Sequence, residues 1–163
     1  MPMKFERHTI FCADMDASLV LYRDLLGLVV VEEKVIEGAA AGGLLQLPPC
    51  RMRIALLAAE PQGDTILGLF QIGGVDIEAL APPHGRPATG QTALVLSTDQ
   101  FDALQARLTA AGAKFLTPPV TYPKTHASER SPAGLYREMI FYDPDAVLVS
   151  IMQIDPLPEE IKP

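Results

Sequence analysis

The chain has 163 residues, 48% of them hydrophobic and 20% charged, and its 20 acidic and 13 basic residues give a formal net charge of −7. This composition is typical of an ordered protein that can bury its own core. Basic residues do not cluster, and nucleic acids and anionic membranes attract proteins through clustered Lys and Arg. We therefore expect neither nucleic acid nor membrane as a partner.

The first part of the chain reads as a strand, a helix and further strands. Residues 7–13 have the apolar character of a short buried strand. A helix follows over residues 14–27, in which Asp14 or Asp16 caps the first turn and Gly27 supplies the left-handed stop. The strands expected after this helix cover residues 28–36, 42–47, 52–59 and, as an extra strand, 65–74.

The same order of elements returns in the second half. Residues 92–98 predict a buried strand, and residues 99–112 predict a helix with one apolar stripe. The distance from Asp99 to Gly112 is 13 residues, the same as in the first helix. The strands expected after it cover residues 113–117, 137–142 and 147–154. The repetition indicates a duplicated module, and neither copy is large enough to close a core alone.

The pattern predicts one domain over residues 5–155. Module one covers residues 5–74 and module two covers residues 91–155, with a linker at 75–90 and a C-terminal tail at 156–163. The linker includes a run rich in Pro and Gly. A second loop, over residues 117–134, is long for a compact domain, and we interpret it either as a lid or binding loop or as a disordered segment.

The cysteines and the N-terminal residues bear on location. Cys12 and Cys50 are isolated and do not form a Cys-x-x-Cys pair, so no zinc knuckle or disulfide framework is indicated. No stretch approaches the roughly 20 apolar residues of a membrane span, and the N-terminal residues lack the apolar core of a signal peptide. We expect a cytoplasmic protein.

Two stretches resemble a known family. The stretch ADMDASLVLYRDLLGLVVVEE is similar to the first strand and helix signature of the vicinal oxygen chelate superfamily, and FYDPDAVLVSIMQ is similar to its final turn and strand. That superfamily includes glyoxalase I, extradiol dioxygenases, methylmalonyl epimerase and bleomycin resistance proteins. The resemblance implies an α+β glyoxalase-like fold, with two βαβββ modules that form a cup-shaped mixed sheet, helices outside and the ligand in the cup.

The resemblance also implies positions for a metal. In metal-dependent members, His, Gln or Glu side chains from the first and last strands of each module hold a divalent cation. The corresponding positions here hold Arg7, Thr92 and Ser150, and the strand taken as the last of module one, residues 51–58, contains no such side chain. His8 would point to the opposite face of its strand from Arg7. We therefore expect no metal and no other cofactor.

The implied cup would be mostly apolar, with hydroxyl and guanidinium groups. The side chains expected to line it are Arg7, Thr9, Phe11, Thr92, Leu94, Leu96, Arg137, Met139, Phe141, Leu148, Ser150 and Met152. Such a wall suits a partly apolar organic ligand with an anionic group. The apolar members could equally be core, and Arg137 could pair with the acidic turn at residues 143–145. A buried Arg7 needs either a ligand anion or an internal partner such as Glu32 or Glu33.

Two functions remain open. The first is a metal-independent protein that binds a small organic ligand, in the manner of antibiotic-sequestering resistance proteins. The second is a lyase, isomerase or dioxygenase-type enzyme acting on a small oxygenated substrate, with a true glyoxalase or extradiol dioxygenase the weaker choice. The candidates for an acid or a base are Tyr122, His126 and Glu138, and Arg7 is a further candidate. We expect surface positions for His126 and His84, and the resemblance favours a homodimer.

Overall fold

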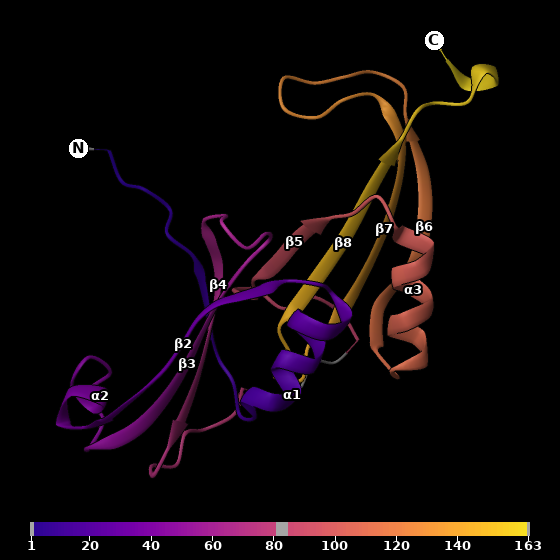
Figure 1. The fold of residues 1–163 in the computed structure, drawn as a ribbon. Helices are drawn as coiled ribbons and strands as arrows, with labels where there is room; N and C mark the ends of the chain where they lie inside the picture. The colour runs from indigo at the N-terminus through magenta and orange to yellow at the C-terminus, as the bar shows by residue number, and fades with distance from the viewer. Residues whose placement is uncertain (1, 81–84, 163) are drawn as a thin grey trace. The chain divides into compact units, whose positions relative to one another are not determined.

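The computed structural model describes residues 2–80 and 85–162. The chain divides into two compact units, residues 1–81 and 82–163, and each unit contains one four-stranded sheet (Figure 1). His84 lies outside the described residues. No helix among the described residues is both long and apolar enough to span a membrane.

Unit one has the predicted order of a strand, a helix and three strands. Its elements are β1 (His8–Phe11), α1 (Met15–Leu19), η1 (Val20–Leu25), β2 (Val29–Gly38), α2 (Ala39–Gly43), β3 (Cys50–Ala58) and β4 (Thr65–Gly73). The strand order is β1-β4-β3-β2. β1 runs parallel to β4, and the other pairs are antiparallel, so the sheet is mixed, as predicted.

Unit two repeats this arrangement. Its elements are β5 (Ala93–Ser97), α3 (Phe101–Ala110), β6 (Lys114–Lys124), β7 (Gly134–Tyr142), β8 (Leu148–Asp155) and η2 (Glu159–Ile161). The strand order is β5-β8-β7-β6, with β5 parallel to β8. The prediction of two βαβββ modules is therefore confirmed.

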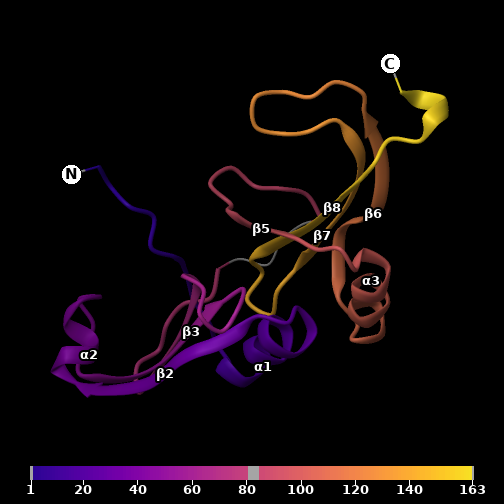
Figure 2. The ribbon, with the colours of Figure 1, turned by 45° about the horizontal axis from the view of Figure 1, so that its top comes forward.

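The prediction of a strand at residues 42–47 was wrong. Residues 39–43 form the short helix α2, and a turn follows in which the Gly42 carbonyl accepts hydrogen bonds from the Leu45 and Leu47 amides. α2 lies at the end of the β2 and β3 ribbon (Figure 2). There Ala41 packs in a buried cluster with Met52 and Ile54 of β3. The segment 65–74, predicted as an extra strand, is instead the last strand of module one, β4.

Half of the predicted long loop at residues 117–134 is strand. β6 continues to Lys124, and β7 begins at Gly134, so only residues 125–133 connect them. The register of β6 against β7 shifts twice between Phe115 and Val120. The prolines at 118 and 119 fall in this irregular part of an edge strand, where a missing amide donor is tolerated.

The two module helices differ in how they begin. In α1 the Asp14 carboxylate caps the helix as predicted, accepting from the amides of Asp16 (2.9 Å) and Ala17 (3.2 Å). In α3 the N-cap is Gln100 rather than Asp99. The count from the N-cap to the closing glycine is therefore one residue longer in module one, and the π-helical η1 accommodates that extra residue.

Each sheet buries one face against its own helix. In unit one, Arg53 of β3 reaches the Asp16 carboxylate of α1 at 2.7 Å. In unit two, the Phe101 amide of α3 donates to the Gln153 side-chain oxygen of β8 at 3.0 Å. These bonds identify the helix-covered face of each sheet.

Candidate functional site

Alternation along β1 divides its side chains between the two faces of sheet one. Ile10 is buried and pairs with Leu69 on the α1 side, and His8 shares that side. Thr9 pairs with Gly68, and Phe11 pairs with Phe70, on the face opposite α1. Arg7 precedes β1, and its side chain lies against the same face, beside Gly68. The prediction that Arg7 and His8 point to opposite faces is confirmed.

The Arg7 side chain is held by an aromatic ring rather than by a carboxylate. Its guanidinium carbon lies 5.8 Å from the centroid of the Phe70 ring, a cation–π arrangement. The ring of Phe11 meets Phe70 edge to face, with centroids 5.9 Å apart. We call Arg7, Thr9, Phe11, Gly68 and Phe70 the Arg7 surface. Phe11 is 48% exposed, so this surface is open to solvent.

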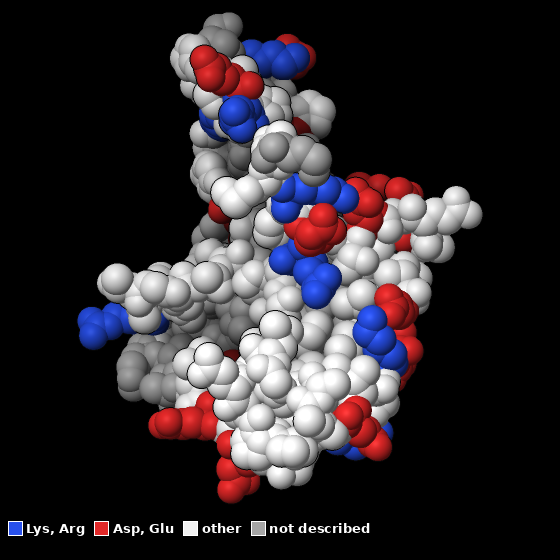
Figure 3. Space-filling view, turned by 90° about the vertical axis from the view of Figure 1, so that its left-hand side faces the viewer, with Lys and Arg blue, Asp and Glu red and all other residues white. Residues whose placement is uncertain are grey.

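The two predicted internal partners of Arg7 are taken by other cations. Glu32 pairs with Lys34 at 2.6 Å, and Glu33 pairs with Arg53 at 2.8 Å. Within residues 2–80 and 85–162, no carboxylate lies within ion-pair distance of the Arg7 guanidinium. The exposed guanidinium therefore keeps its hydrogen-bond donors available. On the face drawn in Figure 3, acidic and basic side chains are interspersed.

In unit two, several residues predicted to line the cup lie on the helix-covered face instead. Met139 and Phe141 are fully buried and pair with Ile151 and Val149, whose side chains share the α3 side with Gln153. By the same pairing, Leu94 and Leu96 lie on that side. The physical reason is register: a one-residue difference in pairing transfers every side chain of a strand to the other face.

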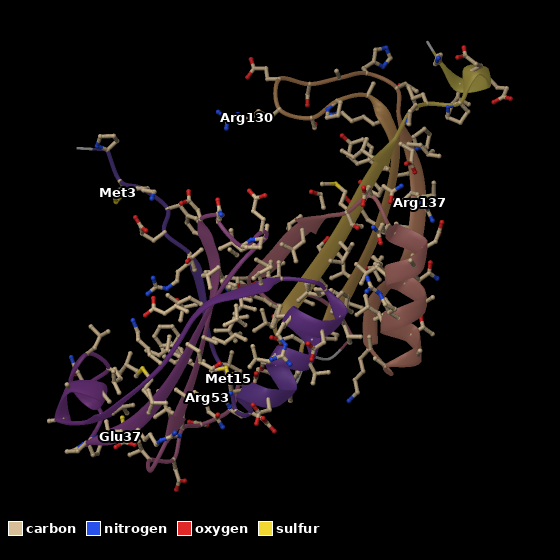
Figure 4. The ribbon with its side chains drawn as sticks, in the orientation of Figure 1. Met3, Met15, Glu37, Arg53, Arg130 and Arg137 are labelled. Carbon is tan, nitrogen blue, oxygen red and sulfur yellow. The ribbon has the colours of Figure 1, made fainter. Side chains whose placement is uncertain are left out.

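Arg137 is likewise directed at the helix, where it lies beside α3 in Figure 4. Its guanidinium forms two hydrogen bonds with the Asp102 carboxylate of α3, one of them at 3.2 Å, and its carbon lies 4.6 Å from the Phe101 ring centroid. The hydrogen bond to Arg137 lowers the pKa of Asp102 and raises the pKa of Arg137. Arg137 therefore pairs with the helix, not with the acidic turn at residues 143–145.

The face of sheet two opposite α3 carries the remaining predicted residues. Ser150 and Met152 lie there, paired with Ile140 and Glu138 of β7. Ser150 is only 9% exposed, and its hydroxyl makes no hydrogen bond within the described part of the chain. Leu148 shares this face. Thr92 is exposed and lies before β5, so it takes no part in the strand pairing.

Two of the three acid or base candidates meet on this same face. Tyr122 and Glu138 lie in adjacent rows of this face, and partial burial followed by the nearby Glu138 carboxylate raises the pKa of Tyr122. His126 is exposed in the connection 125–133, where its Nδ1 is 2.9 Å from the Thr125 hydroxyl. The structure thus places Tyr122 near Glu138, whereas His126 contacts Thr125 in the connection 125–133.

The comparisons with known proteins identify the family. The model of the Glyoxalase/Bleomycin resistance protein/Dioxygenase superfamily matches residues 4–151. The chain belongs to this superfamily. A glyoxalase family protein from Bacillus cereus has the same fold, with a TM-score of 0.74 at 18% identity over 95% of this chain and 96% of that chain. No curated protein gave a significant match.

Two further solved structures share the fold of this superfamily member. A glyoxalase/dioxygenase from Nostoc punctiforme is 21% identical over 94% of this chain and 92% of that chain, with a TM-score of 0.59. A fosfomycin resistance protein from Mesorhizobium loti is 15% identical over 93% and 91%, with a TM-score of 0.53. These likenesses support the fold and leave the activity to be argued from the side chains.

The structure corrects two of the positions compared with the superfamily's metal ligands. Because α3 begins one residue later than expected, Ala93 rather than Thr92 stands seven residues before its N-cap. The strand that pairs with β1 is β4, not the strand at 51–58. Gly68 on β4 corresponds to Ser150 on β8. Two residues after Gly68, the Phe70 carbonyl accepts from the Cys12 amide, just after β1. Two residues after Ser150, the Met152 carbonyl accepts from the Thr98 amide, just after β5.

The corrected set of side chains does not fit a divalent cation. Gly68 and Ala93 offer no ligand atom, Ser150 offers a neutral hydroxyl, and Arg7 carries a permanent positive charge. Among the described residues, no three His, Cys, Asp or Glu side chains gather into a group that could hold a metal ion. The sequence pattern did not identify Gly68 and Phe70 as site residues. The available signal was the alternation of side chains along segment 65–74, which puts Gly68 and Phe70 on the same face of their strand.

Proposed function

We propose that this superfamily member is a binding protein for a small, partly apolar organic anion and that the Arg7 surface receives it. The observation that supports this most directly is the exposed guanidinium of Arg7, which rests on Phe70 without an ion-pair partner in the described residues. A guanidinium fixed in this way can donate two parallel hydrogen bonds to a carboxylate or a similar oxyanion.

The surroundings of Arg7 suit the rest of such a ligand. Phe70 is anchored because it also packs against the buried cluster containing Met52 and Ile54. The half-exposed ring of Phe11 and the Thr9 hydroxyl add an apolar and a polar contact on the same face. In this proposal the protein needs no metal and no other cofactor, because binding uses only these side chains. The homodimer and the cytoplasmic location remain predictions.

A second candidate function is an enzyme of the lyase, isomerase or dioxygenase type. The nearness of Tyr122 and Glu138 on one face of the sheet favours it, since this places a proton donor beside a carboxylate. The raised pKa of Tyr122 means that this phenol stays protonated near pH 7, so in such an enzyme it would act as a proton donor rather than as a base.

The binding proposal is tested by replacing Arg7 with Met. Thermal-shift screening of the wild-type protein with catechols, α-keto acids, glutathione conjugates and glycopeptide antibiotics identifies a stabilising ligand. For an anionic ligand we expect Arg7→Met to weaken binding at least about tenfold, because a hydrogen bond to a charged group contributes roughly 1.5–3 kcal/mol.

The matched control is Arg130→Met, which removes an exposed arginine from the connection 125–133 of unit two. Its affinity should equal that of the wild type. Equal affinity in Arg7→Met and the wild type would contradict the proposal. Recovery of a chemically altered ligand after incubation would instead support the enzyme.

A further inference from the structure

A second set of side chains crosses the sheet of unit two on the face opposite α3. Tyr122 of β6, Tyr136 of β7 and Ile154 of β8 are paired in one row across three strands. The adjacent row contains Val120, Glu138 and Met152. The exposed fractions are 41% for Val120, 42% for Tyr122 and 37% for Ile154. Glu138 is thus the one carboxylate within these two rows, which are otherwise apolar and aromatic.

The two tyrosines form a fixed aromatic platform. Their rings are stacked, with centroids 5.5 Å apart and an interplanar angle of 20°. Tyr136 is 6% exposed, and its hydroxyl donates to the Pro132 carbonyl at 2.8 Å. The inner ring is therefore held in place, and it supports the outer ring of Tyr122 at the open edge strand of the sheet.

Glu138 gives this platform a negative charge that no nearby cation neutralises. Its carboxylate lies in the row next to Tyr122 on the same face, and within the described residues it forms no ion pair with a lysine or arginine. Lys124 follows on the same face of β6, but its amine is bonded to Ser131 and to the Ser128 hydroxyl. Arg137 is bonded to Asp102 on the opposite face.

We propose that this tyrosine platform, formed by Tyr122, Tyr136 and Glu138, binds an organic cation with apolar substituents, such as a quaternary ammonium. The face of an aromatic ring attracts a cation through its quadrupole. The carboxylate supplies the opposite charge, while Val120 and Ile154 contact the alkyl groups.

The test uses choline and its neutral analogue 3,3-dimethylbutan-1-ol as probes. In NMR titrations of protein labelled at the methionine methyl groups, choline should produce a saturable shift of the Met152 signal. The neutral analogue should bind at least about fivefold more weakly, because it lacks the charge that the ring and the carboxylate attract. Equal binding of the two probes, or no binding of choline, would overturn the proposal.

Two variants locate the site. Glu138→Gln keeps the shape of the side chain without its charge, and Tyr122→Leu removes the outer ring. Each should weaken choline binding at least about fivefold while the amide spectrum shows an intact fold. Glu129→Gln, which changes an exposed carboxylate in the connection 125–133, should bind choline as the wild type does. Unchanged affinity in Glu138→Gln would refute the assignment.

Discussion

At the scale of single residues, Gly68 determines where the Arg7 side chain can lie. A Cβ atom at this position would be 3.2 Å from both Cδ and Nε of Arg7 and 3.0 Å from Cε1 of Phe70. Gly68 has no positive φ angle that would itself require glycine. The reason for a glycine here is therefore space, because its missing side chain lets the guanidinium stem approach the sheet.

Replacing Gly68 with Ala should displace Arg7 from the Phe70 ring. We expect the Arg7 Nε resonance to shift and the affinity for an anionic ligand to fall severalfold. Gly73→Ala is the matched control, since Gly73 lies on the same strand and its added Cβ would meet only the Arg51 carbonyl, at 3.9 Å. An unchanged Arg7 resonance in Gly68→Ala would show that the two residues are not coupled.

At the scale of elements, the two module helices satisfy their first amides differently. Asp14 caps α1 with its own side chain. Gln100 caps α3 without a side-chain bond, and the Phe101 amide is satisfied instead by Gln153 from β8. The start of α1 is thus specified locally, whereas the start of α3 depends on a residue 52 positions away in the sequence.

This difference predicts unequal costs of removing the two N-cap side chains. Asp14→Ala should lower the free energy of unfolding by about 1 kcal/mol. Asp14→Asn should keep most of this stability, because an Asn side chain, like that of Asp, accepts hydrogen bonds from the free amides of the first turn. Gln100→Ala should cost much less, since that side chain makes no capping bond. The three variants are compared by chemical denaturation, and equal losses in Asp14→Ala and Gln100→Ala would contradict this reading.

At the scale of the whole molecule, the two modules share one topology but have diverged. Unit one contains α2 and the cluster beneath it, whereas β6 of unit two extends to Lys124. The four positions that correspond to metal ligands in the superfamily hold Arg7, Gly68, Ala93 and Ser150 in these two units. Neither unit therefore provides His, Gln, Asp or Glu at these positions, which is consistent with binding that does not use a metal.

The metal content of the purified protein tests this proposal. Elemental analysis of protein prepared without an affinity-tag metal should find no stoichiometric Fe, Mn, Ni, Co or Zn. Treatment with a chelator should leave the melting temperature unchanged, because a metal bound to the native state would raise it by mass action. Stoichiometric metal whose removal lowers the melting temperature would overturn the metal-independent proposal.

The sequence by itself determined the module order and the shared face of Arg7, Thr9 and Phe11. These are local properties, since the hydrophobic period distinguishes helices from strands and alternation within one strand is fixed by its pleat. Asp14 and Gly27 likewise marked the limits of the first helix because capping and left-handed stops involve neighbouring residues. The family resemblance rested on the same local signatures.

Only the tertiary structure decided which residues of different strands share a face. Arg137 was placed with Ser150 by the sequence pattern, but pairing across β7 and β8 puts it on the opposite side. That register depends on hydrogen bonds between strands and on the turn that joins them, not on composition. The same holds for Gly68, whose importance appears only when β4 pairs with β1 and brings it against the Arg7 side chain.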